Sequence, residues 1–305
     1  MPKKSSRRRR DWGGPIGWDR VRAIFGNPQP PRIVKECQFE YADEDLERLA
    51  RTPHTQIDFR DLWYYYHDLA SVELQPDLFD YLFPACLMHW HVTLMQDQGC
   101  GRGDIEFHDA LRRGNVLEKM VTPARRDAIF EFFRDSFLER LDAERGFTCS
   151  TLRDLESGWL ARFNTMGCLM PRIELFWESW WSLASPGRAV AALKYCSGLM
   201  YLGWENPLYR PFSRFVGSMC PYLNHGDSGI TRQGWMRGNL DYLSATLTTD
   251  FVADRVIQAV ARLEGEPEWE QARQLKWDLP RCRDLVSFRV AELPVLLAGD
   301  TKFNH

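Results

Sequence analysis

The stretch from Pro76 to Leu141 decides the fold. It reads Pro76-Asp-Leu-Phe-Asp-Tyr-Leu-Phe-Pro-Ala-Cys-Leu-Met-His-Trp-His91, then Gly99-Cys-Gly-Arg-Gly-Asp104, then Thr122-Pro-Ala-Arg-Arg-Asp-Ala-Ile-Phe-Glu-Phe-Phe-Arg-Asp-Ser-Phe-Leu-Glu-Arg-Leu141. Pro76 and Thr122-Pro123 predict two helix starts, because proline costs no hydrogen bond in a first turn and threonine caps one. Pro84 lies inside the first pattern and predicts a kink or a break there.

Helical patterns continue outside this stretch, and Asp58 and Thr248 are further predicted caps. We expect helices at about residues 18–25, 43–50, 58–69, 173–183, 188–202, 248–263 and 266–277. The tail Leu293-Pro-Val-Leu-Leu297 fits either a strand or a packed extended segment. Because hardly any segment alternates with period two, the predicted fold is all-α, a multi-helix bundle.

The chain divides into three predicted parts. Residues 1–35 form a basic tail and an irregular segment, residues 36–146 a first helical unit, and residues 151–305 a second unit with a C-terminal extension. The tripeptide Arg113-Gly114-Asn115 recurs as Arg237-Gly238-Asn239, each time before a helix that starts with threonine. Two readings stay open: an internal duplication, or chance similarity among helical segments.

Composition points to a protein with a large aromatic core. The 305 residues include 12 Trp, 18 Phe and 10 Tyr, and 44% of the chain is hydrophobic. The 8 cysteines form no CxxC pair, so we expect reduced thiols in the cytoplasm. We see no apolar signal segment and no run long enough to span a bilayer, and therefore expect no membrane contact.

Charge is distributed unevenly along the chain. The net charge is −3, yet the first ten residues contain only basic charges, on Lys3, Lys4, Arg7, Arg8, Arg9 and Arg10. This tail is a candidate for binding nucleic acid, and the alternative is a solvated tail that binds nothing.

Two acidic runs are candidates for binding a partner protein. They comprise Asp43, Glu44 and Asp45, and Glu264, Glu266, Glu268 and Glu270. Acids on a surface can meet a basic cleft of another protein. Alternatively, they are solvated starts of helices, where carboxylates interact favourably with the helix dipole.

Four side chains are the best metal candidates: Cys86, His89, His91 and His108. Their spacing argues against a metal, because residues two apart on a helix point about 200° apart. A hydrogen-bonded polar group in an aromatic core is the alternative for each histidine. No catalytic motif is evident, so we predict neither catalytic residues nor a cofactor.

One resemblance emerges from these residues. Leu78-Phe-Asp-Tyr-Leu-Phe-Pro-Ala-Cys-Leu87 followed by Thr122-Pro-Ala-Arg-Arg-Asp-Ala-Ile-Phe-Glu-Phe132 resembles small all-helical bacterial proteins, uncharacterised families of which some are placed among toxin-immunity proteins. In these, a Phe-x-Tyr-Tyr-Leu-Pro-Ala helix precedes a Leu-Thr-Pro-x-Gln-Arg helix. Here Phe83 is an extra residue and Arg125 replaces the glutamine. The resemblance covers at most residues 37–141 and implies a fold, without catalytic residues.

We therefore predict a non-catalytic bacterial protein of the immunity or antitoxin type. It would bind a toxin or effector and occlude that partner's basic active-site cleft with its acids. The first alternative is a nucleic-acid-associated factor, for example in phage defence, that uses the Arg-rich tail. The second is a metal-dependent enzyme with a site near Cys86, His89, His91 and His108.

Overall fold

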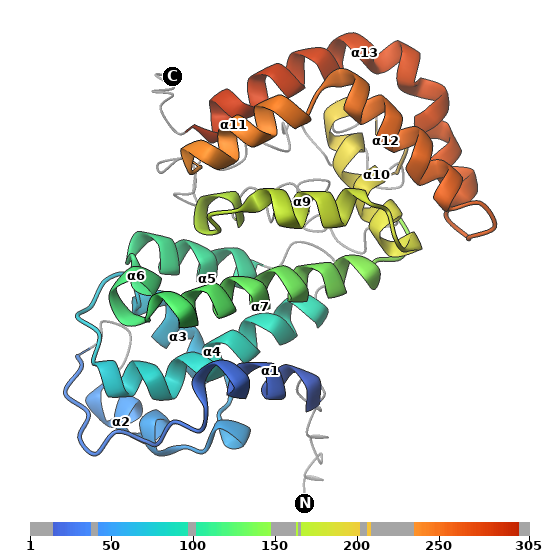
Figure 1. The fold of residues 1–305 in the computed structure, drawn as a ribbon. Coiled ribbons are helices and arrows are strands. Elements are labelled where there is room, and N and C mark those ends of the chain that lie inside the picture. Colours follow the sequence, from blue (N-terminus) through green and yellow to red (C-terminus); the bar gives the residue numbers. More distant parts are fainter. Residues whose placement is uncertain are drawn as a thin grey trace, which may run out of the picture.

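The computed structural model describes residues 15–37, 42–96, 102–147, 163, 166–201, 206–208 and 235–298. The secondary structure of these residues includes twelve α-helices and one 3-10 helix with assigned bounds, and these residues contain no strand (Figure 1). The prediction of an all-α, multi-helix fold is therefore confirmed.

The helices form two groups that follow the order of the chain (Figure 1). The first group comprises α1 (Pro15–Phe25), α2 (Asp43–Arg51), η1 (His54–Gln56), α3 (Phe59–Asp68), α4 (Pro76–Gln96), α5 (Arg102–Arg113), α6 (Val116–Met120) and α7 (Pro123–Asp142). The second comprises α9 (Ile173–Trp181), α10 (Pro186–Met200), α11 (Arg237–Thr246), α12 (Thr249–Arg262) and α13 (Trp269–Leu297). We call these groups the N-terminal and C-terminal halves.

Local capping chemistry sets several helix starts. The side-chain oxygens of the three predicted caps, Asp58, Thr122 and Thr248, accept hydrogen bonds from the backbone N–H of Arg60, Arg125 and Phe251 at 3.0, 3.4 and 3.0 Å. Ser185 caps α10 in the same way, accepting from the backbone N–H of Arg188 at 3.2 Å. Each cap satisfies one of the backbone N–H groups that a helix start leaves without an internal partner.

Interior prolines do not end the helices that contain them. Of the predicted kink or break at Pro84, the break is wrong, since α4 runs through it. Residues on every side of Pro84, including Leu82, Phe83, Ala85 and Cys86, are fully buried, and this packing offsets the lost hydrogen bond. Likewise α13 continues through Pro280 and Pro294 to Leu297, so the C-terminal segment is neither strand nor extended.

The glycine-rich segment is shorter than its sequence indicates, because α5 already begins at Arg102. The Arg-Gly-Asn tripeptides also differ in local structure. Asn115 has a left-handed backbone (φ 48°) and precedes α6, whereas Asn239 lies inside α11 with its side chain buried. The internal duplication stays a prediction.

One hydrophobic core connects the two halves. Helix α7 packs against α1 and α4 on one side and against α9 and α10 on the other. Phe137 of α7 and Phe176 of α9 meet edge to face, with ring centroids 5.9 Å apart. The predicted division at residues 146–151 follows directly after α7, the helix that both halves share (Figure 1).

The junction between α7 and α10 is polar and tightly packed. Glu144 pairs with Arg140 (2.9 Å) and with Lys194 of α10 (2.6 Å), and all three side chains are nearly inaccessible to solvent. Asp142 accepts two hydrogen bonds from the Arg188 guanidinium, at 2.8 and 2.9 Å. Gly187 lies against the backbone carbonyls that end α7. These contacts fix the start of α10 on the end of α7.

Candidate functional site

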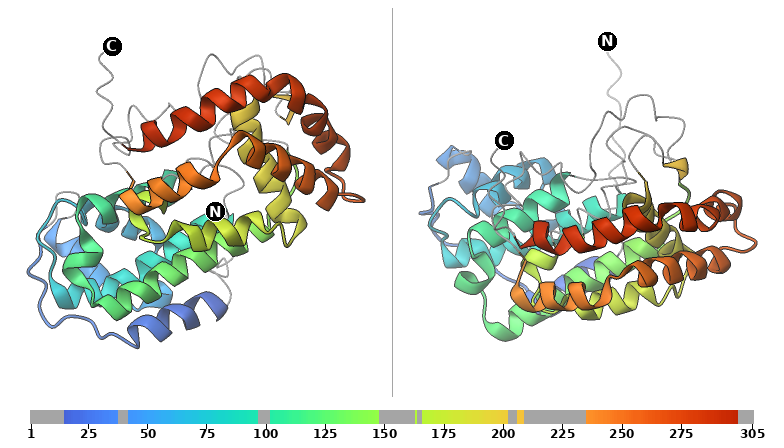
Figure 2. Two further views of the ribbon diagram at one scale, coloured as in Figure 1. Left: turned by 45° about the horizontal axis from the view of Figure 1, so that its top comes forward. Right: turned by 90° about the horizontal axis from the view of Figure 1, so that it is seen from above.

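Helix α13 carries the strongest candidate for a functional surface. One face of this amphipathic helix packs on α10, α11 and α12 through residues such as Leu275, Val286 and Leu293. The helix runs along the outer edge of the C-terminal half (Figure 1 and Figure 2), so its other face is turned away from the core.

Three large apolar side chains project from that outer face. The exposed fractions are 81% for Trp277, 61% for Phe288 and 55% for Val295. In a straight α-helix these spacings of 11 and 7 residues would place the three positions within about 20° of one another around the axis, whereas α13 bends along its length (Figure 1 and Figure 2). We call this line of Trp277, Phe288 and Val295 the α13 ridge. Exposed Arg281 and Asp284 lie between Trp277 and Phe288, so the ridge combines apolar and charged side chains.

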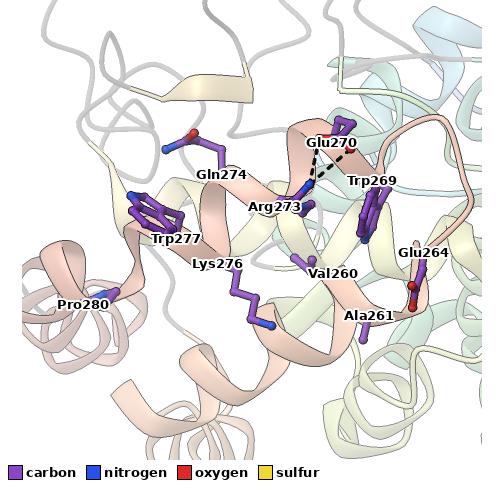
Figure 3. A pocket seen from close by; sticks show the side chains of 10 residues that line it. All are labelled: Val260, Ala261, Glu264, Trp269, Glu270, Arg273, Gln274, Lys276, Trp277 and Pro280. Carbon is purple, nitrogen blue, oxygen red and sulfur yellow. Dashed lines mark hydrogen bonds and ion pairs between the residues drawn. The ribbon is translucent and has the colours of Figure 1, made fainter.

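A groove of about 880 Å³ lies beside the ridge, where α12 ends and α13 begins. Figure 3 shows Trp277 and Pro280 at one end and Trp269 and Glu264 at the other. Its lining consists of Val260, Ala261, Glu264, Trp269, Glu270, Arg273, Gln274, Lys276, Trp277 and Pro280. Trp277 thus belongs to both the groove and the ridge.

Charged side chains lie between the two tryptophans of the groove (Figure 3). The Arg273 guanidinium lies over the Trp269 ring, 4.7 Å from its centroid, and pairs with Glu270 at 3.2 Å. Glu264 and Lys276 complete the charged lining. The two carboxylates and two cations give the groove no net charge. A groove without net charge is a better binding site for a mixed apolar and polar protein surface than for a polyanion. Tryptophan and arginine are also the residues that contribute most often to binding energy at protein interfaces.

The two acidic runs do not lie next to each other in the structure. Asp43, Glu44 and Asp45 are exposed in the first turn of α2, where Asp45 pairs with Arg48 at 3.0 Å. The other acidic run lies at the turn between α12 and α13, at the opposite end of the molecule (Figure 1).

Within this second run the four glutamates have different surroundings. Glu264 and Glu270 line the groove, and Glu266 is half-buried. Glu268 is only 8% exposed and accepts a hydrogen bond from the Gly146 backbone N–H at 2.7 Å. Glu268 therefore stabilises the segment after α7 and does not belong to a partner-binding surface.

The four metal candidates point to different neighbours. His91 Nδ1 lies 2.9 Å from Ser136 Oγ, and the His108 ring stacks on Trp90 at 5.1 Å. His89 contacts the Tyr66 ring at 5.6 Å, and Cys86 is fully buried. Nowhere in the part of the chain that the structure describes do three His, Cys, Asp or Glu side chains converge as a metal would require. The described residues therefore do not form the metal site that was considered near Cys86, His89, His91 and His108.

Burial governs the titration of these groups. It lowers the pKa of His108 to about 3 and that of His89 to about 4, and it also lowers the pKa of His91. It raises the pKa of the Cys86 thiol, which makes this thiol a poor nucleophile. Neutral imidazoles and a protonated thiol are what an apolar core favours.

The six basic residues of the tail, Lys3, Lys4, Arg7, Arg8, Arg9 and Arg10, lie outside the described residues. Over the ranges that are described, no helix combines the length and the apolar character needed to cross a bilayer. A scan against protein-family models and searches of curated proteins and of solved structures found no match to this chain.

Proposed function

We propose that this chain is a non-catalytic binding protein that engages a protein partner through the α13 ridge and the adjoining groove. The observation that carries the proposal is the exposure of Trp277, 81%, in line with Phe288 and Val295. Covering three such side chains removes a large apolar area from water, which is the main source of binding free energy. The polar groove beside them would supply the rim of the interface.

The resemblance of residues 37–141 to toxin-immunity proteins supports a bacterial toxin or effector as the partner, bound in the cytoplasm. The positions of the two acidic runs change the expected complementary surface, which the sequence predicted to be a basic cleft. Exposed acids at two distant ends of the molecule do not favour a single basic cleft as the complementary surface. We propose instead that the complementary surface is apolar at its centre and mixed in charge at its edge.

Replacing Trp277 by alanine should weaken partner binding at least about 30-fold, the loss typical of a tryptophan at the centre of an interface. The free energy of unfolding should change by less than about 0.5 kcal/mol, because the side chain packs little in the free protein. Calorimetric titration with the product of the neighbouring gene measures the first quantity, and urea denaturation the second.

Tyr64→Ala is the matched control, since Tyr64 is an exposed aromatic residue of α3, 46% accessible and far from α13. It should leave partner affinity unchanged. Unaltered affinity in the double variant Trp277→Ala, Phe288→Ala would rule out this surface.

A second function, nucleic-acid binding, is favoured by the six cations and no acids among the first ten residues. Deleting residues 1–10 should abolish binding of duplex DNA or RNA and leave partner binding intact. For the full-length chain, log Kd should rise with log salt concentration with a slope of up to about 5, from six phosphate contacts. Fluorescence anisotropy with a labelled duplex measures both effects. Equal affinity of the two chains for the duplex would show that the tail is a solvated extension.

A further inference from the structure

The central part of α13 carries a symmetric series of side chains. Trp277, Arg281, Asp284 and Phe288 follow one another at intervals of 4, 3 and 4 residues. The two outer members of the series are aromatic, and the two inner members carry opposite charges. Residues with this spacing share one side of an α-helix, so the series reads the same in both directions along one face of α13.

All four side chains are accessible to solvent. The exposed fractions are 81% for Trp277 and 61% for Phe288. The Arg281 side chain is 73% exposed, and Asp284 is exposed as well. Arg281 is only loosely paired with Asp278, at 3.5 Å. A guanidinium has five N–H donors, so Arg281 keeps donors for a second carboxylate.

A second copy of α13, laid antiparallel on this face, presents a complementary group at each position. The Trp277–Phe288 pair and the Arg281–Asp284 pair have the same midpoint in the sequence. A two-fold axis through that midpoint places Trp277 of each copy opposite Phe288 of the other, and Arg281 opposite Asp284. Because a two-fold interface repeats every contact, the dimer would have two aromatic pairs and two charged pairs.

The order of the charges selects the antiparallel arrangement. Two parallel α13 helices would place Arg281 opposite Arg281 and Asp284 opposite Asp284, and like charges in contact repel each other. An unrelated protein could bind the same face without a symmetric spacing and without opposite charges at its centre. A second copy of this chain is therefore the occupant that these residues favour.

The shape of α13 limits the size of this contact. The helix curves around the C-terminal half, with its outer face on the convex side (Figure 1 and Figure 2). Two convex helices touch over a short length, and the series spans about 17 Å. The four aromatic rings of the dimer would cover roughly 400–700 Å² of apolar surface. This is a small area for a specific interface, so the dimer should be weak and reversible.

We propose that this chain forms a weak homodimer in which two antiparallel α13 helices meet through Trp277, Arg281, Asp284 and Phe288. The dimer covers Trp277, which the proposed partner also contacts, so self-association and partner binding exclude each other. Only this competition rests on the proposed function. The dimer follows from the side chains of α13 and is measured without any partner.

Sedimentation velocity of the full-length protein alone tests the proposal. The sedimentation coefficient should rise with concentration toward that of a dimer, with a Kd of about 10–100 µM for so small a contact. Asp284→Arg should weaken the association at least about 10-fold, because both charged pairs become contacts between cations. Arg281→Asp should have the same effect through contacts between carboxylates. Asp241→Arg is the matched control, since Asp241 is an exposed residue of α11 that pairs with Arg237, and it should leave the Kd unchanged.

Combining the two reversals distinguishes two-fold pairing from a general effect of charge. In the double variant Arg281→Asp, Asp284→Arg, opposite charges face each other again, and the Kd should return to within about 3-fold of the original. An equimolar mixture of the two single variants should also form a dimer that neither forms alone. A double variant as weak as the single variants, or a natural chain that stays monomeric at about 300 µM, would overturn the proposal.

A second disrupting variant covers the case that Arg281→Asp does not fold, since Asp278 lies close to that position. Trp277→Ala removes both aromatic pairs and should weaken the dimer at least about 10-fold. An unchanged Kd in this variant would equally overturn the proposal. Circular dichroism shows for each variant that the helices are retained.

Discussion

Replacing Glu144 by alanine should lower the free energy of unfolding by about 3–5 kcal/mol, the cost typical of removing one member of a buried ion pair. Glu144 is the carboxylate shared by Arg140 at 2.9 Å and Lys194 at 2.6 Å, in a part of the core that admits almost no solvent. Without it, two cations from α7 and α10 are left facing each other. Urea denaturation at pH 7 measures the loss.

Asp241→Ala is the control for this experiment. It removes an ion pair with Arg237 (3.1 Å) of which both side chains are largely exposed, so the expected loss is below about 1 kcal/mol. A similar loss in the two variants would mean that the network between α7 and α10 contributes no more than a surface pair.

Gly187→Ala should lower the free energy of unfolding by about 3 kcal/mol or more. A Cβ atom at Gly187 would overlap with the carbonyl oxygens of Leu141 and Asp142. These are backbone atoms at the end of α7 and cannot rotate away, so the two helices must move apart. Such a shift would also disturb the paired hydrogen bonds between Arg188 and Asp142. The thermal unfolding midpoint and urea denaturation both report the effect.

Gly198→Ala in the same helix is the matched comparison. No atom lies within 4 Å of a Cβ at this position. Alanine should therefore stabilise α10 by about 0.5–1 kcal/mol, because it restricts the unfolded chain more than glycine does. The two substitutions are chemically identical, and opposite signs would show that close helix contact at Gly187 is the cause. Equal effects would contradict it.

The sequence predicted what depends on neighbouring residues alone. Helix starts at Asp58, Thr122 and Thr248 follow from a side-chain oxygen placed next to backbone N–H groups, and all three are confirmed. The helix does not break at Pro84, one of the two outcomes predicted there, because the cost of an interior proline is local whereas its compensation comes from distant helices packed around α4. The pattern of a single sequence does not show how distant helices pack, so it cannot predict this compensation.

The same limit explains what was missed at the candidate site. A helix was expected to end near Trp277, so Phe288 and Val295 were not placed on the same helix, and their alignment could not be recognised. Intervals of 11 and 7 residues between the three apolar positions were the available signal. For the histidines, the expectation of a hydrogen-bonded ring in an aromatic core is confirmed for His91, which has Ser136 beside it. His108 differs, because its Nε2 has no partner.

The position of α7 between the halves has a consequence for biosynthesis. The ribosome completes α7 at Asp142, but α10, which covers its far side, ends only at Met200. At about 5–20 residues per second, translation of the intervening segment takes roughly 3–12 s. During that interval the nascent chain presents Phe137 and its neighbours to the surrounding medium. Early chain termination after α7 would leave this apolar strip permanently uncovered, and such fragments would aggregate or become clients of chaperones.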